Sequence, residues 1–224
     1  MKKIIYLVVV IVIFTSCNSV APLKMSDAYK GIYSEQPLSI LIMPPINKTT
    51  NVEAKEYFHS SLNVPLANAG YYVIPPFMSI EMLKRESAYD AELFLNEPMT
   101  KFGDVFQADL ALFTIIHKWA KSYSIVKVDV EYILKSTKTN EVLYSRRGEV
   151  DFNTSISAGG GLLLDIALTA VNTAATKYID VARITNLYTF KDLPKGKYSP
   201  IYRTDGDKIA GKKQFKVALS SSYN

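Results

Sequence analysis

The sequence has few of the side chains on which nucleophilic, redox and metal chemistry depend. Among its 224 residues there are one cysteine, Cys17, and two histidines, His59 and His117. A lone cysteine excludes an internal disulfide framework and a metal–thiolate cluster. We expect His59 to lie on the polar side of a helix, in contact with solvent. His117 is expected to be a core or edge residue, because no partner for it is evident in the sequence.

Common catalytic and nucleotide-binding motifs are missing as well. The triple glycine at 159–161 is not followed by the Lys-Ser/Thr pair of a phosphate-binding loop, and no G-x-S-x-G nucleophile motif occurs. The apolar run Ile4–Phe14 is too short to span a bilayer comfortably. We therefore predict no catalytic residue, no metal ligand and no cofactor. An enzyme or small-ligand binder remains an alternative, which would need a deep pocket that gathers His117 with acidic residues.

The N-terminus has the features of a bacterial secretion signal. Two lysines precede the apolar run, and a Thr-Ser pair and Cys17 follow it. Residues Phe14–Cys17 resemble the lipobox of bacterial lipoproteins, with phenylalanine where leucine is usual. The resemblance implies that residues 1–16 are removed as a signal peptide and that Cys17 is acylated, which anchors the chain in a membrane. Asn18, which is not an aspartate, favours the outer membrane by the same resemblance. The alternative is an ordinary signal peptide with a chance cysteine.

Charge is distributed unevenly along the rest of the chain. After removal of the signal peptide the net charge is +3, but residues 191–224 alone hold eight basic and three acidic side chains. We predict a lipidated tether over 17–36, an α/β lipoprotein domain over 37–190 and a basic C-terminal extension over 191–224. The extension is either simply solvated, the interpretation we favour, or contacts anionic lipid or a polyanionic envelope polymer. Nucleic acid is not an expected partner of an exported protein.

A strand–helix–strand pattern starts the predicted domain. Leu38–Met43 is a short apolar run that ends at two prolines, and Tyr71–Ile74 is a second such run. Between them, apolar residues over Glu53–Ala69 recur at helical spacing. These three segments predict a βαβ unit. Pro65 lacks a backbone N–H, so we expect it to kink or split the helix near Ser61.

The remaining segments predict a mixed sheet. Asp109–Ile116 is almost continuously apolar and is expected to be the central strand. Tyr123–Leu134 alternates between apolar and charged residues, which is typical of a half-exposed strand, and Glu141–Phe152 is expected to return antiparallel to it. Short helices are expected over 78–85, 91–95 and 98–106, and a long one over Leu162–Thr185. The predicted fold class is α/β, a three-layer-like domain with a mixed sheet, a long C-terminal helix and a basic tail.

Two surfaces are candidates for contact with other envelope proteins or with a second copy of the chain. One is the polar loop after the first strand, because α/β sheets commonly bind partners at the C-terminal edge of their strands. The other is an alanine-rich stripe on the helix 162–185, where small side chains let two backbones approach closely. The residues of these surfaces are Asn47, Lys48, Thr49, Asn51, Ala174 and Ala175.

Several of these segments resemble one known family. The stretch PLSILIMPPINKTTNVEAKEYFHSSLNVPLANAGYYVIPP is similar to the bacterial lipoproteins typified by a genome-derived neisserial surface antigen. FGDVFQADLALFTIIHKWAKSY, the hairpin EYILKSTKTNEVLYSRRGEV and, more weakly, LPKGKYSP are similar to the same family. The resemblance implies a fold like the TolB N-terminal domain and the periplasmic domain of the curli-secretion lipoprotein. Those relatives are binding and assembly proteins, so no catalytic residue is carried over to this chain.

These observations together favour a lipoprotein anchored in the outer membrane through Cys17 and facing the periplasm. We expect it to act as a non-catalytic component of an envelope assembly, export or transport complex. A lipoprotein regulator of a cell-wall synthase is an alternative, although a tether of about twenty residues is short for crossing the periplasm. Because the curli-secretion relative works as a ring, self-association is a further expectation, and any oligomer is expected to lack a pore.

Overall fold

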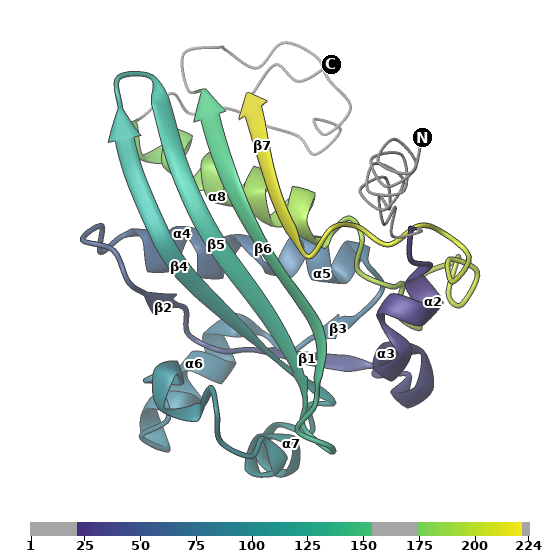
Figure 1. Ribbon diagram of the computed structural model, residues 1–224. Coiled ribbons are helices and arrows are strands. Elements are labelled where there is room, and N and C mark those ends of the chain that lie inside the picture. The colour runs from purple at the N-terminus through teal and green to yellow at the C-terminus, as the bar shows by residue number, and fades with distance from the viewer. Residues whose placement is uncertain (1–21, 154–173, 221–224) are drawn as a thin grey trace, which may run out of the picture.

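The computed structural model describes residues 22–153 and 174–220, and within them seven strands form one mixed sheet (Figure 1). The strand order is β3-β1-β4-β5-β6-β7, with β2 paired to the far part of β4. Strand β1 runs parallel to β3 and β4, β5 is antiparallel to both of its neighbours, and β7 is parallel to β6. The elements are α2 (Met25–Ala28), α3 (Lys30–Glu35), β1 (Ser39–Ile42), β2 (Ile46–Asn47), α4 (Ala54–Ser61), α5 (Asn63–Asn68), β3 (Tyr72–Val73), α6 (Pro76–Arg85), the 3-10 helix η1 (Ala91–Phe94), α7 (Thr100–Phe106), β4 (Leu110–Ser122), β5 (Ile125–Ser136), β6 (Val142–Asn153), α8 (Ala174–Phe190) and β7 (Gln214–Ser220).

The predicted βαβ unit is confirmed. Strands β1 and β3 pair in parallel, and the helical segment between them lies against the sheet. Pro65 divides that segment into α4, which ends at Ser61, and α5, which begins at Asn63. The split follows from the missing N–H of proline and the clash of its ring with the preceding turn. Gly70 ends the segment with a φ of 90°, a conformation that a residue with a Cβ rarely adopts.

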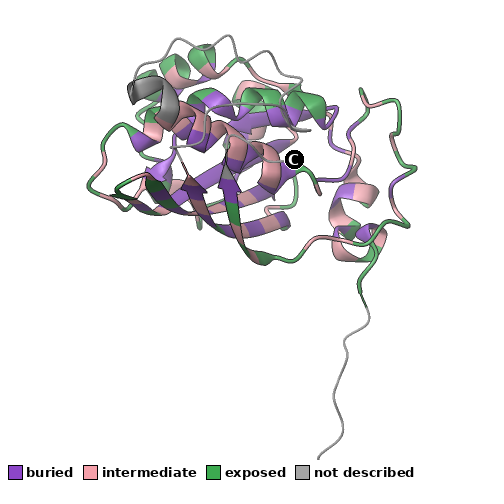
Figure 2. Cartoon of the chain, turned by 90° about the horizontal axis from the view of Figure 1, so that it is seen from above, coloured by how far each residue is buried: buried purple, intermediate pink, exposed green. Residues whose placement is uncertain are grey.

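Two hydrophobic clusters lie on opposite faces of the sheet. Figure 2 shows the strands largely buried, in purple, and the outer sides of the helices exposed, in green. The larger cluster lies between the sheet and the helices α2 to α5 and α8, with Phe58 and Tyr132 fully buried in it. The smaller cluster lies between β1, the first half of β4 and the helices α6, η1 and α7, with Phe113 at its centre. The predicted three-layer arrangement therefore holds where β1 and β4 lie side by side.

The long hairpin of β5 and β6 has the predicted alternation. Val126, Val128 and Val130 are buried in the larger cluster, whereas Lys127 and Asp129 point to the opposite face. The helices α6 and α7 lie beside the start of β4, and they do not cover the face of the hairpin that carries Lys127 and Asp129 (Figure 1). Strand β4 is longer than the predicted Asp109–Ile116, because its second half pairs with β5 as far as Ser122.

The folded domain begins earlier than the sequence suggests. Within the predicted tether 17–36, helices α2 and α3 bury Met25, Tyr29 and Ile32 in the larger cluster. Tyr29 packs against Tyr144 of β6, with ring centroids 5.3 Å apart. The part of 17–36 available as a tether is therefore shorter than expected, because its apolar side chains find partners far along the sequence.

The predicted basic extension 191–224 is also part of the fold over its described length. Leu193 is fully buried, and the backbone N–H of Gly196 donates to the carbonyl of Ala69 at 2.8 Å. Strand β7 then adds to the sheet beside β6. The extension is therefore not a solvated tail. Its sequence lacks periodicity because most of it wraps around the domain as a loop.

The last helix lies partly outside the described residues. Of the predicted helix Leu162–Thr185, the structure describes α8 from Ala174, and it continues to Phe190. The extra turn is stabilised by buried polar contacts: the Tyr132 hydroxyl donates to the amide oxygen of Asn186, whose nitrogen donates to the Phe58 carbonyl. Taken over the described chain, the helices include none with the length and apolar character of a membrane span.

Candidate functional site

His117, one of the two histidines, lies at an irregularity of β4. The register between β4 and β5 shifts between Ile116 and Lys118, and the Nε2 of His117 lies 2.9 Å from a carboxylate oxygen of Glu131 on β5. The sequence offered no evident partner, because Glu131 follows fourteen residues later and faces His117 only across the hairpin. Both side chains are about one quarter exposed. They form a surface pair on the sheet and do not line the hollow beside Arg146 that is described below.

His59 is buried, which corrects the prediction that it is solvated. It lies next to Phe58 in α4, and only 6% of its surface is exposed. The prediction took only the helix face towards the sheet to be buried, but a second side of α4, the one that carries His59, is buried as well. Burial lowers the pKa of His59, while the charge of Glu56 raises it in part. Within the described chain its Nε2 has no hydrogen-bond partner, so the neutral ring is the favoured form.

The predicted polar loop is held together by its own side chains. The Asn47 amide donates to the carbonyl of Asn51 at 2.7 Å, and its oxygen accepts from the backbone and hydroxyl of Thr49. The Asn51 side chain accepts from the N–H of Ala54 and so caps the start of α4. Lys48 is exposed. The loop is thus a rigid turn, and its role as a contact surface stays a prediction.

The second predicted surface is only partly described. Ala174 and Ala175 form the first residues of α8, but their side chains lie outside what the structure describes, as do residues 162–173. Across the described ranges, no group of three or more His, Cys, Asp or Glu side chains is placed to hold a metal ion. Of the six predicted contact residues, hydrogen bonds bring Asn47, Thr49 and Asn51 together in one turn, and the alanine surface stays a prediction.

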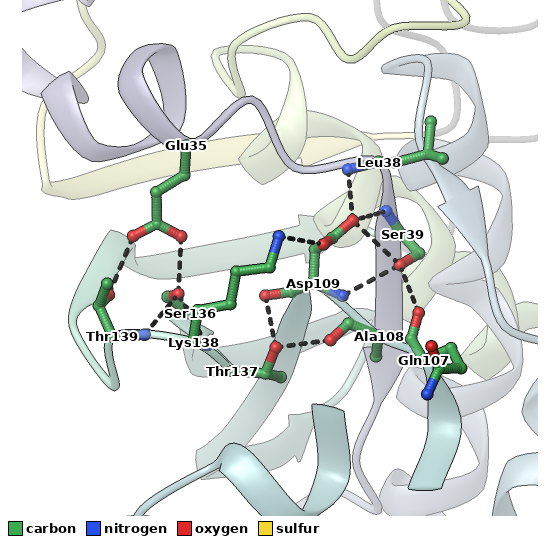
Figure 3. Close-up of polar contacts among 10 residues, drawn as sticks. All are labelled: Glu35, Leu38, Ser39, Gln107, Ala108, Asp109, Ser136, Thr137, Lys138 and Thr139. Carbon is green, nitrogen blue, oxygen red and sulfur yellow. Dashed lines mark hydrogen bonds and ion pairs between the residues drawn. The ribbon is translucent and has the colours of Figure 1, made fainter. Parts of the chain in front are cut away.

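A polar cluster centred on Asp109 joins four segments at one end of the sheet (Figure 3). One carboxylate oxygen of Asp109 accepts from the N–H groups of Leu38 and Ser39 at 2.9 and 3.2 Å, and the other lies 2.8 Å from the Lys138 ammonium. Burial raises the pKa of Asp109, but the Lys138 contact and the two backbone N–H groups outweigh it, so the pKa is lowered. The carboxylate is therefore ionised and fully engaged.

The same cluster fastens α3 to the hairpin turn. The two carboxylate oxygens of Glu35 accept from the hydroxyls of Ser136 and Thr139 at 2.7 and 2.9 Å (Figure 3). The Thr137 hydroxyl donates to the carbonyls of Ala108 and Asp109. Because these groups satisfy one another, the cluster stabilises the junction and does not offer a free acid or base. The sequence analysis missed it, since Asp109 stands 70 residues from the Ser39 that it binds.

A second buried charge lies between β6, α8 and the segment before β7. The Arg146 guanidinium donates to the carbonyls of Thr189 and Lys212 and pairs with Asp192 at 2.6 Å. It lies over the ring of Phe215, 4.6 Å from the ring centroid. A shallow hollow of about 420 Å³ adjoins it. Arg146 therefore fixes the C-terminal segment to the sheet.

Four large apolar side chains on β3 and α6, close together in the sequence, are exposed. Tyr72, Phe77, Met78 and Met82, which we call the α6 patch, lie within eleven residues of one another in the sequence. Phe77 is 81% exposed and Met78 is 58% exposed. Met78 and Met82 are four residues apart on α6 and so share one helix face. Monomeric proteins rarely expose large apolar side chains together without a partner.

The fold and these sites define an α/β domain with a seven-strand mixed sheet and helices on both faces. The chain belongs to the family described as "Putative lipoprotein GNA1162-like", which matches residues 27–195. This confirms the family resemblance. Membership implies anchoring in a bacterial envelope membrane. The finer likeness to the TolB and curli-secretion domains stays a prediction.

Individual relatives agree with the family assignment. The chain is 25% identical over 156 residues to "Putative lipoprotein NMB1124/NMB1162" of Neisseria meningitidis serogroup B, covering 68% of this chain and 72% of that protein. The crystal structure of lipoprotein GNA1162 from Neisseria meningitidis has a TM-score of 0.50 and 21% identity, covering 68% and 98% of the two chains. A PelC dodecamer from Paraburkholderia phytofirmans has a TM-score of 0.41 and 14% identity, covering 67% and 83%. The neisserial structure supports the fold alone.

Proposed function

We propose that the protein is an outer-membrane lipoprotein, held by acyl chains on Cys17 and facing the periplasm. It serves there as a non-catalytic binding component of an envelope assembly, export or transport complex. Family membership supports the anchoring, and the lipobox resemblance assigns it to Cys17. The observation that carries the binding role is the α6 patch, where four large apolar side chains within eleven residues of the sequence are exposed.

The α6 patch suits contact with a protein for two reasons. Methionine side chains are flexible and adapt to the shape of a partner, while Phe77 and Tyr72 supply large rigid rings. The patch also stands on a firm base, because Leu83 and Ser79 on the inner side of α6 are fully buried. Burying Phe77 alone would contribute about 1.5–3 kcal/mol to binding through the area removed from water.

A non-catalytic role agrees with the state of the polar groups. Asp109 is engaged by Leu38, Ser39 and Lys138, and Arg146 is engaged by Asp192 and two carbonyls. The enzyme alternative would need His117 in a deep pocket with acidic residues, and the His117–Glu131 pair lies instead on a sheet surface. The synthase-regulator alternative loses support as well, since packing from Met25 onward shortens the tether.

Site-specific photo-crosslinking in cells tests the binding role. A photoreactive residue replaces Met78 in the patch or, as the control, Val105, which is similarly exposed on α7. We expect a discrete adduct with an envelope protein from position 78 and none from position 105. The same adduct should disappear when Phe77→Ser and Met82→Ser are added, while the protein keeps its fold and membrane location. Equal adducts from both positions, or none from either in correctly located protein, would contradict the proposal.

A further inference from the structure

The first described residues of the chain, Pro22–Met25, lie beside a lysine-rich loop, residues 206–213. The backbone N–H of Ala210 donates to the carbonyl of Leu23, and the N–H of Met25 donates to the carbonyl of Lys208, both at 2.8 Å. Lys24 and Ile209 form an antiparallel bridge between these hydrogen bonds. The first described residues and the loop 206–213 therefore make one continuous surface.

This surface combines exposed apolar and basic side chains. Leu23 and Ile209 are 54% and 57% exposed, and Lys208, Lys212 and Lys213 are exposed around them. Within the described residues, no carboxylate lies within 4 Å of the ammonium of any of these three lysines. Nearby acidic groups are already paired: Asp207 binds Lys24 at 2.6 Å, and Asp192 binds Arg146. We call the five residues Leu23, Lys208, Ile209, Lys212 and Lys213 the exit face.

Chain length limits how far the exit face can be from a membrane. Leu23 lies six positions after Cys17, so even a fully extended link between them reaches only about 20 Å. A domain of this size has a radius of gyration of about 16 Å and hence a diameter of about 40 Å. The link is therefore shorter than the domain is wide. If residue 17 is held in a bilayer, the exit face is the part of the domain that lies nearest to that bilayer.

We propose that the exit face docks the domain on the anionic phospholipid surface of the membrane in which its N-terminus is held. The inference rests on the membrane anchoring of the proposed function. The two apolar side chains fit the interfacial layer, and the lysines fit the lipid phosphates. Helix α6 lies on the other side of the domain from α2 in Figure 1, so the α6 patch then points towards the periplasm.

The hollow next to Arg146 extends the exit face. Lys212 and Lys191 both line it, and the ring of Phe215 lies in its wall. Gly211 allows this arrangement, because a Cβ there would lie 2.2 Å from the carboxylate of Asp192. The loop can therefore approach the segment that follows α8 closely, and a headgroup phosphate on the exit face meets lysines from two sides.

Fluorescence quenching by labelled lipid tests the docking. The full-length protein is purified from membranes and reconstituted in vesicles of phosphatidylcholine, either alone or mixed with phosphatidylglycerol, that carry a headgroup quencher. Ile209→Cys places a dye on the exit face, and Met78→Cys places it on the α6 patch as the matched control. We expect strong quenching at position 209 in the anionic vesicles, weaker quenching there without phosphatidylglycerol, and little quenching at position 78.

A charge variant supplies the quantitative result. Each lysine near an anionic surface strengthens association about fivefold, so Lys208→Gln, Lys212→Gln and Lys213→Gln together should lower the docked-to-undocked ratio about a hundredfold. Lys55→Gln, Lys84→Gln and Lys101→Gln, which remove the same charge elsewhere, should leave the ratio unchanged. Equal quenching at positions 209 and 78, or no dependence on phosphatidylglycerol, would overturn the inference.

Two further outcomes separate this inference from the proposed function. Mass spectrometry of the vesicle-bound protein shows whether acyl chains or the uncleaved run Ile4–Phe14 hold the N-terminus, and the exit face is expected to dock in both cases. Protein that does not float with vesicles contradicts the anchoring itself, and the docking with it. Floating protein whose Lys208, Lys212 and Lys213 bind purified cell-wall polymer and not the lipid would overturn the docking alone.

Discussion

The two halves of the sheet differ in how many of their faces are covered. Strand β1 and the first half of β4 are buried on both faces, by α4, α5 and α8 on one side and α6, η1 and α7 on the other. The second half of β4, most of β5, and the strands β6 and β7 have helices against one face in the described structure, and the other face carries charged pairs. The end of β5 is an exception, because Ile133 packs on the smaller cluster. Arg147 pairs there with both carboxylate oxygens of Asp129, at 2.8 and 2.7 Å.

The change in burial along β4 shows how the helices that cover a strand determine its pattern of apolar residues. Its first seven residues are all buried and almost all apolar, whereas exposed positions begin after the irregularity at His117. A strand between two helical layers needs apolar side chains on both faces, and one between a helical layer and water needs them on alternate residues. The same strand therefore shows both patterns, and the residue where they change marks the edge of the second helical layer.

The largest expected effect is inside the larger cluster, between α4 and the sheet. Phe58 is fully buried, and its ring lies edge-on to Trp119 with centroids 5.9 Å apart. Phe58→Ala should lower the free energy of unfolding by about 3–5 kcal/mol because it opens a cavity in the larger cluster. Phe77→Ala, also on a helix but 81% exposed, should change it by about 0.5 kcal/mol or less. Equal losses in denaturant titrations of the two variants would refute this contrast.

Removing a buried ion pair should likewise lower the free energy of unfolding more than removing an exposed one, with a smaller difference than for the phenylalanines. Asp192→Ala leaves the buried Arg146 guanidinium without its carboxylate, which should cost about 3 kcal/mol. The matched variant Asp151→Ala removes an exposed partner of Lys127 on the open face, 3.9 Å away, and should cost about 1 kcal/mol or less. Chemical denaturation at neutral pH compares the two. A larger loss from Asp151→Ala would mean that the open face is covered in solution.

The Asp109 cluster should give a signature in acid. In the folded protein the pKa of the Asp109 carboxyl lies below its ordinary value of 3.8. The ionised carboxylate therefore contributes its full stabilisation at any pH well above 3.8. This contribution is lost as the pH falls through the lower folded pKa, where the carboxylate is protonated. Asp109→Asn should therefore be less stable than the parent near neutral pH and should show a shallower loss of stability on acidification. Parallel curves for parent and variant would contradict the assigned shift.

The smallest effect is expected at the surface histidine. His117→Gln keeps a polar side chain opposite Glu131, and both groups are partly exposed, so stability should change by about 0.5 kcal/mol or less. Cellular function should be intact, since we assign no chemistry to this pair. A folded and correctly located His117→Gln protein with a null phenotype would revive the enzyme alternative. His59 is unsuitable for this test because it is buried.

Much of the fold could be predicted because its signals are local. Prolines and Gly70 limit the strands and helices of the βαβ unit, and Pro65 splits its helix at the predicted place. Alternation over Tyr123–Leu134 identified the buried face of β5. The central position of β4 followed from its continuous apolar run.

The missed features all depend on contacts between distant residues. Helices α2 and α3 are fixed by partners such as Asp205, which accepts from Tyr33 at a separation of 172 residues. Strand β7 pairs with β6 only after α8 and a long wrapping loop. His59 was misplaced because periodicity identifies one buried face, whereas the side of α4 that carries His59 is buried as well. The Asp109 cluster gave no motif, since its partners come from four separate segments.

The most direct test of the central claim concerns Cys17. Cys17→Ser removes the only thiol of the chain and therefore the site that the lipobox resemblance assigns to acylation. We predict that acyl labelling disappears and that the protein leaves the membrane fraction or accumulates as an uncleaved precursor. Unchanged fractionation together with unchanged acyl labelling in this variant would contradict the lipoprotein assignment.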